Sequence, residues 1–426
     1  MTCDKTKESI TTQFVVALTI SIALAVFIGS FTNSITPQWD GTQYIQMARY
    51  GIIGNKHLVA PYAYRPGTPF LAHIASRVFS ISVENAFRAI GWVSVVLFSV
   101  SVFTLSRHFA KNLTQALITV AIIGLSFQHI KYPLFFYSLV DVVAYPLIII
   151  SIWLLITERP LACLLVSSVG CLFKEFLAIP LLLVTLEFAA AFWKVRTTQN
   201  VARLLLAIAI GLSVILIPRV CIPVVSTYQF IDPINDVQSL KHIYLAPTDK
   251  WRWFNIVYSL IGYWLPSLLL LTTHRLNRMW SDLKELGLQA TALIYLTLVL
   301  VLTLYGGSNI VLFVSYSVPI QVIILTLILR QGASAAECIY VLAAMLLFNK
   351  TLLPIPRPDL MAPGVTVSQA VNTFVDFYGG WSSRVNMSTV SRLFQAIALI
   401  GGATCIRHLS LNHGNKELVD VDGNHR

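Results

Sequence analysis

Charged side chains that interrupt apolar sequence are the residues of this chain best placed to do chemistry. Asp141 lies in an apolar stretch, Lys174 and Glu175 separate two apolar runs, and Glu187 lies inside the second of those runs. An ionisable group inside a membrane is costly and marks a functional site by default. The structural alternative is a lattice of ion pairs between helices, and for Glu187 it is the better interpretation. Adjacent residues of a helix do not face each other, so Lys174 and Glu175 are expected to find different partners.

Two further charges, Asp40 and Arg65, lie between the first two apolar runs. Apolar residues follow Asp40 at mostly helical spacing, which predicts an amphipathic helix with Asp40 as its N-cap. A helix cap is the simpler, structural interpretation of Asp40. The argument for a functional carboxylate is that an aromatic segment with a charged residue follows in the same loop. In that segment Arg65 stands between Tyr64 and Pro66. The planar guanidinium group of Arg65 is suited to bidentate phosphate binding. The alternative is that Arg65 lies at the membrane interface and pairs with Asp40 or with a lipid headgroup.

The composition identifies the setting of these charges. The chain has 426 residues, of which 56% are hydrophobic and only 12% charged. A soluble domain carries about 25% charged residues, so a soluble enzyme is excluded and an integral membrane protein is predicted. The net charge of +11 suggests lipid headgroups and topology signals rather than nucleic acid. The cysteines show no metal or disulfide spacing, and no phosphate loop, dinucleotide fingerprint, zinc-protease motif or nucleophile elbow is present.

Apolar runs predict an all-α, polytopic helix bundle. A helix crosses the hydrocarbon core with about 20 mostly apolar residues, and on this basis we expect about twelve spans. They lie near residues 13–31, 86–106, 113–128, 139–157, 161–173, 176–193, 201–218, 254–272, 287–305, 310–329, 336–353 and 391–406.

The density of Lys and Arg in short loops sets the expected orientation. It places both termini in the cytoplasm, with a cytoplasmic tail at 407–426. The whole chain, 1–426, is expected to form one integral membrane domain. Its long loops, 32–85, 219–253 and 354–390, then face outward with interfacial helices. In this orientation Asp141, Lys174 and Glu175 fall on the same side as Asp40 and Arg65.

Several basic residues near the outer ends of spans form a second candidate set. His129 ends the third run and Arg219 ends the seventh, and the central outer loop adds Lys241, His242, Lys250 and Arg252. Together they would supply the positive field that an anionic lipid headgroup requires. Ordinary snorkelling at the membrane interface is the alternative, and it is the better interpretation for Lys241, Lys250 and Arg252.

The first part of the chain resembles a known family. Trp39-Asp40-Gly41 in the first outer loop, the segment Pro61-Tyr62-Ala63-Tyr64-Arg65-Pro66, and a Lys-Glu pair opening a later span are similar to bacterial multi-pass proteins of the GT-C glycosyltransferase superfamily, including mannosyltransferase-like members. The resemblance covers roughly the first 190 residues. It implies a GT-C-like fold and transfer of a sugar from a polyprenyl-phosphate donor at the outer face, with inversion, to a lipid or glycan acceptor.

The resemblance also implies roles for particular residues. The acidic residue of the first outer loop would be a general base or would orient the acceptor, and this carries over to Asp40. Arg65 and Lys174 would stabilise the departing lipid phosphate, and Glu175 would position one of them or the sugar. Asp141, Tyr64, His129 and Arg219 are added as binding residues from their positions in the chain, and not from the resemblance. No cofactor or metal is expected, because one carboxylate is a poor divalent-ion site.

Two features of the sequence depart from the family pattern. Many such proteins carry an acidic residue with an arginine before the tenth or so span, whereas this chain reads GGSNIVLF from 306 to 313. A large C-terminal outer domain for acceptor recognition is also not seen, which favours a small or lipid acceptor.

Two other functions compete with the transferase. A secondary transporter or lipid flippase would also have many spans and buried charges, but those charges would gather near the midplane. A membrane scaffold would tolerate loss of Asp40. The resemblance alone suggests a bacterial inner membrane, and the sugar, the acceptor and the oligomeric state do not follow from the sequence.

Overall fold

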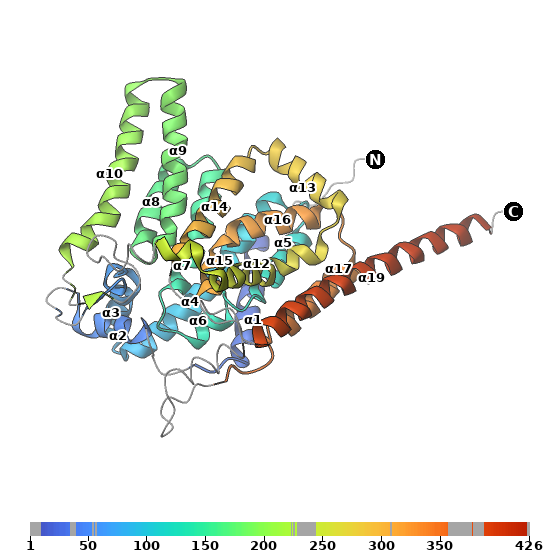
Figure 1. The fold of residues 1–426 in the computed structure, drawn as a ribbon, viewed down its shortest axis with the longest axis horizontal. Coiled ribbons are helices and arrows are strands. Elements are labelled where there is room, and N and C mark those ends of the chain that lie inside the picture. Colours follow the sequence, from blue (N-terminus) through green and yellow to red (C-terminus); the bar gives the residue numbers. More distant parts are fainter. Residues whose placement is uncertain are drawn as a thin grey trace.

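The chain folds as a bundle of helices with one very small sheet in the part that the structure describes (Figure 1). It is a computed structural model, and the residues described are 10–34, 40–52, 55, 58–222, 224, 226–227, 244–306, 309–356, 377 and 387–423. For 226–227 and 409–423 only the backbone is described.

Every apolar run found in the sequence is helical. The helices in these runs are α1 (Ile10–Ser30), α4 (Val83–Phe109), α5 (Leu113–Gly124), α7 (Asp141–Ile156), α8 (Pro160–Cys171), α9 (Ala178–Lys194), α10 (Thr198–Cys221), α12 (Lys250–Leu270), α14 (Gln289–Tyr305), α15 (Ile310–Val314), α16 (Val318–Arg330), α17 (Ala335–Phe348) and α19 (Met387–Gly423). The 3-10 turns η2 (Glu175–Leu177) and η4 (Ser315–Ser317) extend α9 and join α15 to α16. The all-α prediction is confirmed.

Length decides which of these helices can cross a membrane. Among the described residues, seven helical segments are long and apolar enough to span, or eight if α14 forms one bent span with α13 (Thr273–Glu285), from which it turns by 107°. Four other apolar helices, α5, α7, α8 and α17, are shorter than a full span. The chain is therefore a multi-pass membrane protein, and the count of about twelve spans stays a prediction.

Helix α16 lies at the centre of the bundle. It packs against α4, α5, α7 and α12, and nearly all of its side chains are buried. A helix that is apolar on all sides belongs in such an interior. Around it, α4 packs against α7 and α1, and its Val95, Phe98 and Val102 are buried in the core. The centre of the bundle is thus formed by α16, the most buried long segment, and the other helices pack around it.

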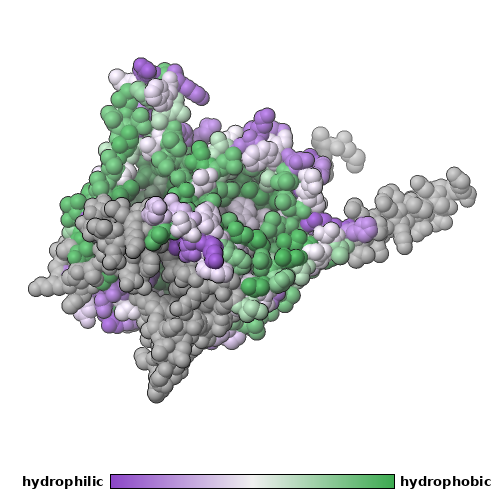
Figure 2. All heavy atoms as spheres, in the orientation of Figure 1, coloured by the Kyte–Doolittle hydropathy of each residue, from purple (hydrophilic) through white to green (hydrophobic). Residues whose placement is uncertain are grey.

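Helix α10, in contrast to the buried helix α16, lies at the edge of the bundle. With α9 it projects beyond the other helices, and Figure 2 shows apolar residues along this pair and hydrophilic ones at its tip. Leu205, Leu212 and Ile217 are more than half exposed. The tip carries Lys194 and Arg196, both exposed. An exposed helix this apolar is suited to contact with lipid tails.

The helix ends expected on the inner side meet one another. Arg275 of α13 donates to both carboxylate oxygens of Glu337 at 2.7 and 2.9 Å, and Arg407 donates to the same carboxylate at 3.1 Å. Glu337 also completes a capping box with Ser334 at the start of α17. These contacts place the start of α13, the start of α17 and the C-terminal helix at one end of the bundle.

The loops expected on the outer side also meet. Strand β1 (Val59–Ala60) of the first loop pairs in parallel with β2 (Ser226–Thr227) of the central loop. The first loop also holds α2 (Asp40–Tyr50), η1 (Tyr62–Tyr64) and α3 (Gly67–Phe79), while η3 (Ala246–Thr248) precedes α12 and α6 (Lys131–Phe135) follows α5. Most of the predicted loop 354–390 lies outside the described residues.

Helix α2 is the amphipathic helix that the sequence predicts, but Asp40 is its first residue rather than the N-cap that precedes it. Tyr44, Ile45, Met47 and Ala48 form its buried face. Tyr50 is 71% exposed, since its position in the last turn points away from that face.

Candidate functional site

Arg65 is the centre of a group of charged side chains. Its Nε and Nη2 atoms donate to the two oxygens of Glu175 at 2.8 and 2.7 Å, which is a bidentate pair. Its Nη1 donates to the Tyr44 hydroxyl at 2.9 Å. Only 8% of Arg65 is exposed. Two segments far apart in the sequence, α2 and the start of the α9 segment, therefore hold one guanidinium.

The backbone around Arg65 is held against the connection between α8 and α9. The Gly67 amide donates to the Leu172 carbonyl at 2.9 Å. A Cβ atom at Gly67 would lie 2.8 Å from the Phe173 ring, closer than real Cβ atoms approach. Glycine is thus required for the start of α3 to sit on this connection, which carries Lys174 and Glu175.

Lys174 forms the second ion pair of the group. Its Nζ lies 3.0 Å from Oδ1 of Asp141, and both side chains are almost fully buried. The Tyr316 hydroxyl donates to the same Asp141 oxygen at 2.6 Å. Lys174 also lies 5.6 Å from the centre of the Phe313 ring, a cation–π arrangement.

The expectation that Lys174 and Glu175 take different partners is confirmed. Lys174 pairs with Asp141 and Glu175 pairs with Arg65, while Lys174 Nζ and Glu175 Oε1 are 4.0 Å apart. The reason is a break in the chain: Lys174 is extended between the end of α8 and η2. An extended residue before a 3-10 turn directs consecutive side chains to different sides.

Asp40 joins this group electrostatically. Burial raises the pKa of the Asp40 carboxyl above its usual value, and the nearby Arg65, a hydrogen bond from Tyr62 and the nearby Lys174 oppose the rise. The group then holds three carboxylates, those of Asp40, Asp141 and Glu175, and two cations. Burial, rather than the surrounding charges, is what favours proton uptake by Asp40, because the two nearby cations oppose it.

A pH dependence follows if Asp40 acts as a base. It accepts a proton only when ionised, so a reaction in which Asp40 is the base should slow as the pH drops through a pKa that lies above the usual 3.8. Tyr62→Phe removes a hydrogen bond that lowers this pKa, and should move the acidic limb of the rate profile to higher pH. Initial rates measured across a range of pH test both the fall in rate at low pH and its shift in the variant. An unmoved limb in the variant would contradict this assignment.

Tyr64 and Arg219 lie side by side next to the group. The Arg219 guanidinium is 5.1 Å from the centre of the Tyr64 ring, and its Nη1 donates to the Ile215 carbonyl at 2.7 Å. Tyr64 is buried, and Arg219 is partly exposed near the end of α10. The two residues thus link the exposed apolar helix α10 to the segment that carries Arg65.

His129 is not brought into the ion pairs. It is 1% exposed, stacks on Phe98 and lies 2.7 Å from the Tyr263 hydroxyl through Nε2. The Tyr145 ring packs on its edge and also stacks on Tyr316, so His129 is separated from Asp141 by aromatic rings.

The remaining basic candidates have separate positions. Arg252 is buried, and it donates to the carbonyls of Thr303 and Gly306 at 2.9 and 2.5 Å, which fixes the C-terminal end of α14. Snorkelling was therefore the wrong interpretation for this residue. Lys250 is exposed, and Lys241 and His242 lie outside the described residues.

Sequence reasoning missed three residues of the group. No binding role was assigned to Tyr44, and Phe313 and Tyr316 lie in or just after the stretch where the family pattern expects an acidic residue and an arginine. That part of the chain contributes an aromatic ring and a hydroxyl to the same group instead. Tyrosines inside apolar runs were the available signal, because a buried hydroxyl usually has a hydrogen-bond partner.

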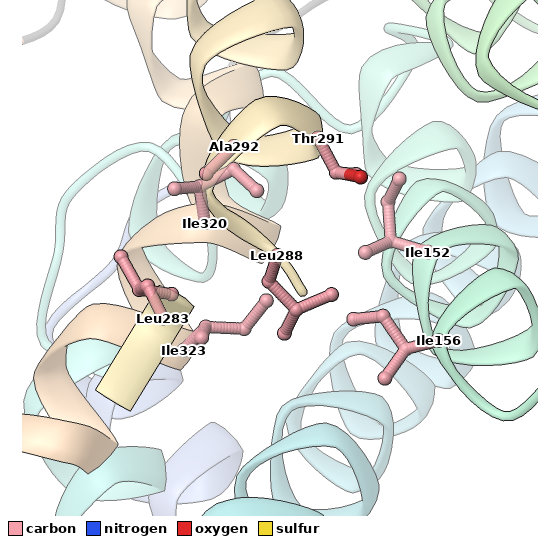
Figure 3. Close-up of a pocket in the computed structure, with 8 residues that line it drawn as sticks. All are labelled: Ile152, Ile156, Leu283, Leu288, Thr291, Ala292, Ile320 and Ile323. Carbon is pink, nitrogen blue, oxygen red and sulfur yellow. The ribbon is translucent and has the colours of Figure 1, made fainter. Parts of the chain in front are cut away.

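The charged group is better suited to binding an anion, through the guanidinium of Arg65, than to binding a metal ion. Asp141 and Glu175 are each already paired with a cation. Within the described ranges no three His, Cys, Asp or Glu side chains are grouped as metal ligands. A separate cavity between α7, α13, α14 and α16 is apolar apart from Thr291 (Figure 3) and has no ionisable lining residue. It therefore has no part in the chemistry of the charged group.

Comparison with known proteins assigns the chain to no family. No protein-family model matches the chain, and a search of curated proteins found no match. The functional argument therefore rests on the site.

Proposed function

We propose that this protein is a membrane glycosyltransferase of the GT-C type, which moves a sugar from a polyprenyl-phosphate donor to a lipid or glycan acceptor with inversion. The observation that carries the proposal is the meeting of two charges from the first outer loop with three at helix starts. Asp40 and Arg65 come from the loop, Asp141 begins α7, and Lys174 and Glu175 precede α9.

The proposed reaction uses these charges in distinct roles. The acceptor hydroxyl attacks the anomeric carbon, its proton passes to Asp40, and the bond from that carbon to the phosphate oxygen breaks. The phosphate leaves with the bonding electron pair. Arg65 and Lys174 stabilise the negative charge that develops there. Asp141 and Tyr316 hold Lys174 in place.

The surroundings of the group support a lipid-linked donor. Near the C-terminal end of the exposed apolar helix α10, Arg219 lies against Tyr64, which is next to Arg65 in the chain. A polyprenyl chain lying along α10 would bring its phosphate toward this basic end. We place the enzyme in a bacterial inner membrane, with both termini in the cytoplasm and the charged group at the outer face.

The location of the charges favours transfer over transport. Transporter charges are expected near the bilayer midplane, at interrupted helices between repeats. Asp141 and Glu175 are instead the first residues of α7 and of the α9 segment, and Glu175 pairs with Arg65 of the long first loop.

The test is transfer of radiolabelled sugar from a panel of polyprenyl-phosphate sugars in membranes that contain the full chain. Transfer above membranes without the chain would support the proposal. No transfer with any donor, together with uptake or flipping of a lipid-linked sugar by reconstituted protein, would replace it with the transporter.

A further inference from the structure

Glu175 differs from the other charged residues of the group in its exposure. Its side chain is 42% exposed, whereas those of Arg65, Lys174 and Asp141 are 10%, 4% and 6% exposed. The carboxylate of Glu175 therefore lies at the open side of the group. When it leaves Arg65, a side chain with this exposure has water beside it to move into.

Arg65 is held in place without Glu175. The Tyr44 hydroxyl accepts from its Nη1, and its backbone amide donates to the Tyr62 carbonyl at 3.0 Å. The Nε and Nη2 edge is directed at the Glu175 oxygens. That edge is the part of a guanidinium that binds carboxylates and phosphates in the same bidentate way.

The backbone allows Glu175 to leave. It is the first residue of a short 3-10 turn that follows an extended residue. Rotation of its side chain away from Arg65 breaks no helical hydrogen bond of α8 or of the α9 helix proper. The fork of Arg65 would then be open toward the exposed side.

We infer that the Glu175 carboxylate is an internal occupant of a phosphate site, and that the phosphate headgroup of a polyprenyl lipid displaces it from the Nε and Nη2 edge of Arg65. This rests on the proposed function and assigns Glu175 a competing role, in place of the positioning role that the family resemblance implies. Exchange of one anion for another keeps the buried guanidinium paired throughout, which avoids the cost of an unpaired buried charge.

The test is direct binding of polyprenyl phosphate without a sugar to the full chain in nanodiscs. Glu175→Gln keeps the size of the side chain but removes the competing charge, and we expect it to bind about tenfold more tightly than the wild type, which equals ~1.4 kcal/mol. Glu84→Gln is the matched control, because Glu84 pairs with Arg49 on the surface of the same end of the molecule. Its affinity should equal that of the wild type.

A second variant covers the case in which Glu175→Gln does not fold. Glu175→Asp keeps the charge but withdraws it from Arg65 by one methylene, and a smaller gain in affinity is expected. Equal or weaker binding by a folded Glu175 variant would overturn the inference. Polyprenol without phosphate and inorganic phosphate are the competing probes. Displacement by polyprenol alone would show that the chain, not the headgroup, is bound, and this too would overturn it.

The results also separate this inference from the proposed function. Tighter lipid-phosphate binding by the variants without sugar transfer by the wild type would keep the phosphate site and remove the transferase. Sugar transfer by the wild type without tighter lipid-phosphate binding by the variants would keep the transferase and remove the inferred role of Glu175.

Discussion

Replacing Asp40 with asparagine should lower sugar transfer by about 10²–10⁴-fold, the usual contribution of a general base. Asparagine has the size of aspartate and still accepts hydrogen bonds at a helix N-terminus, but it cannot take up a proton. The expected loss is therefore in the chemical step, with binding of the donor lipid little changed. Initial rates at saturating donor, in membranes with matched amounts of protein, measure this effect.

The chain contains a matched control for Asp40. Asp249 is the N-cap of α12, where its carboxylate accepts from the amides of Trp251 and Arg252 at 2.9 and 3.3 Å. Asp249→Asn should retain wild-type transfer, because its carboxylate only caps a helix. If Asp40→Asn transfers sugar as fast as Asp249→Asn, Asp40 has only a structural role at the start of α2 and the proposed base lies elsewhere.

Replacing Lys174 with methionine should lower the free energy of unfolding by about 3–5 kcal/mol, the usual cost of removing one partner of a buried ion pair. Methionine fills a similar volume beside Phe313 but leaves the carboxylate of Asp141 without its cation in a buried position. The Tyr316 hydroxyl still donates to Asp141 and offsets part of the loss. Unfolding by denaturant in detergent micelles gives the value.

A double variant distinguishes the charge from the packing. In Lys174→Met with Asp141→Asn no unpaired charge is buried, so most of the lost stability should return. Lys250→Met serves as the surface control, because Lys250 is exposed at the start of α12, and its effect should be small. A double variant as unstable as Lys174→Met alone would show that shape, and not charge, makes Lys174 necessary.

Several features of the site could be predicted from the sequence because they depend on local rules. Charges within apolar sequence identified Asp141, Lys174 and Glu175, and the spacing of apolar residues after Asp40 predicted α2. The pairing of these side chains, in contrast, does not depend on local sequence. Glu175 and Arg65 are 110 positions apart and Tyr316 and Asp141 are 175 apart, and no periodicity relates residues at such separations.

Composition and hydropathy by themselves determined that this chain is an all-α membrane protein and where its apolar helices lie. Transfer of apolar side chains from water to lipid depends on the side chains alone, and a backbone in lipid must satisfy its own hydrogen bonds within each helix. The number of full spans was not settled in this way, since α5, α7, α8 and α17 are apolar but short.

Tertiary structure alone decided which charges pair and which remain exposed. Burial of Lys174 with Asp141, the fork of Arg65 on Glu175, and the hydroxyl of Tyr316 all depend on how α7, the α8–α9 break and the α15–α16 segment pack together. The energy of an ion pair depends on distance and burial, and both are properties of the packed bundle that no single segment contains.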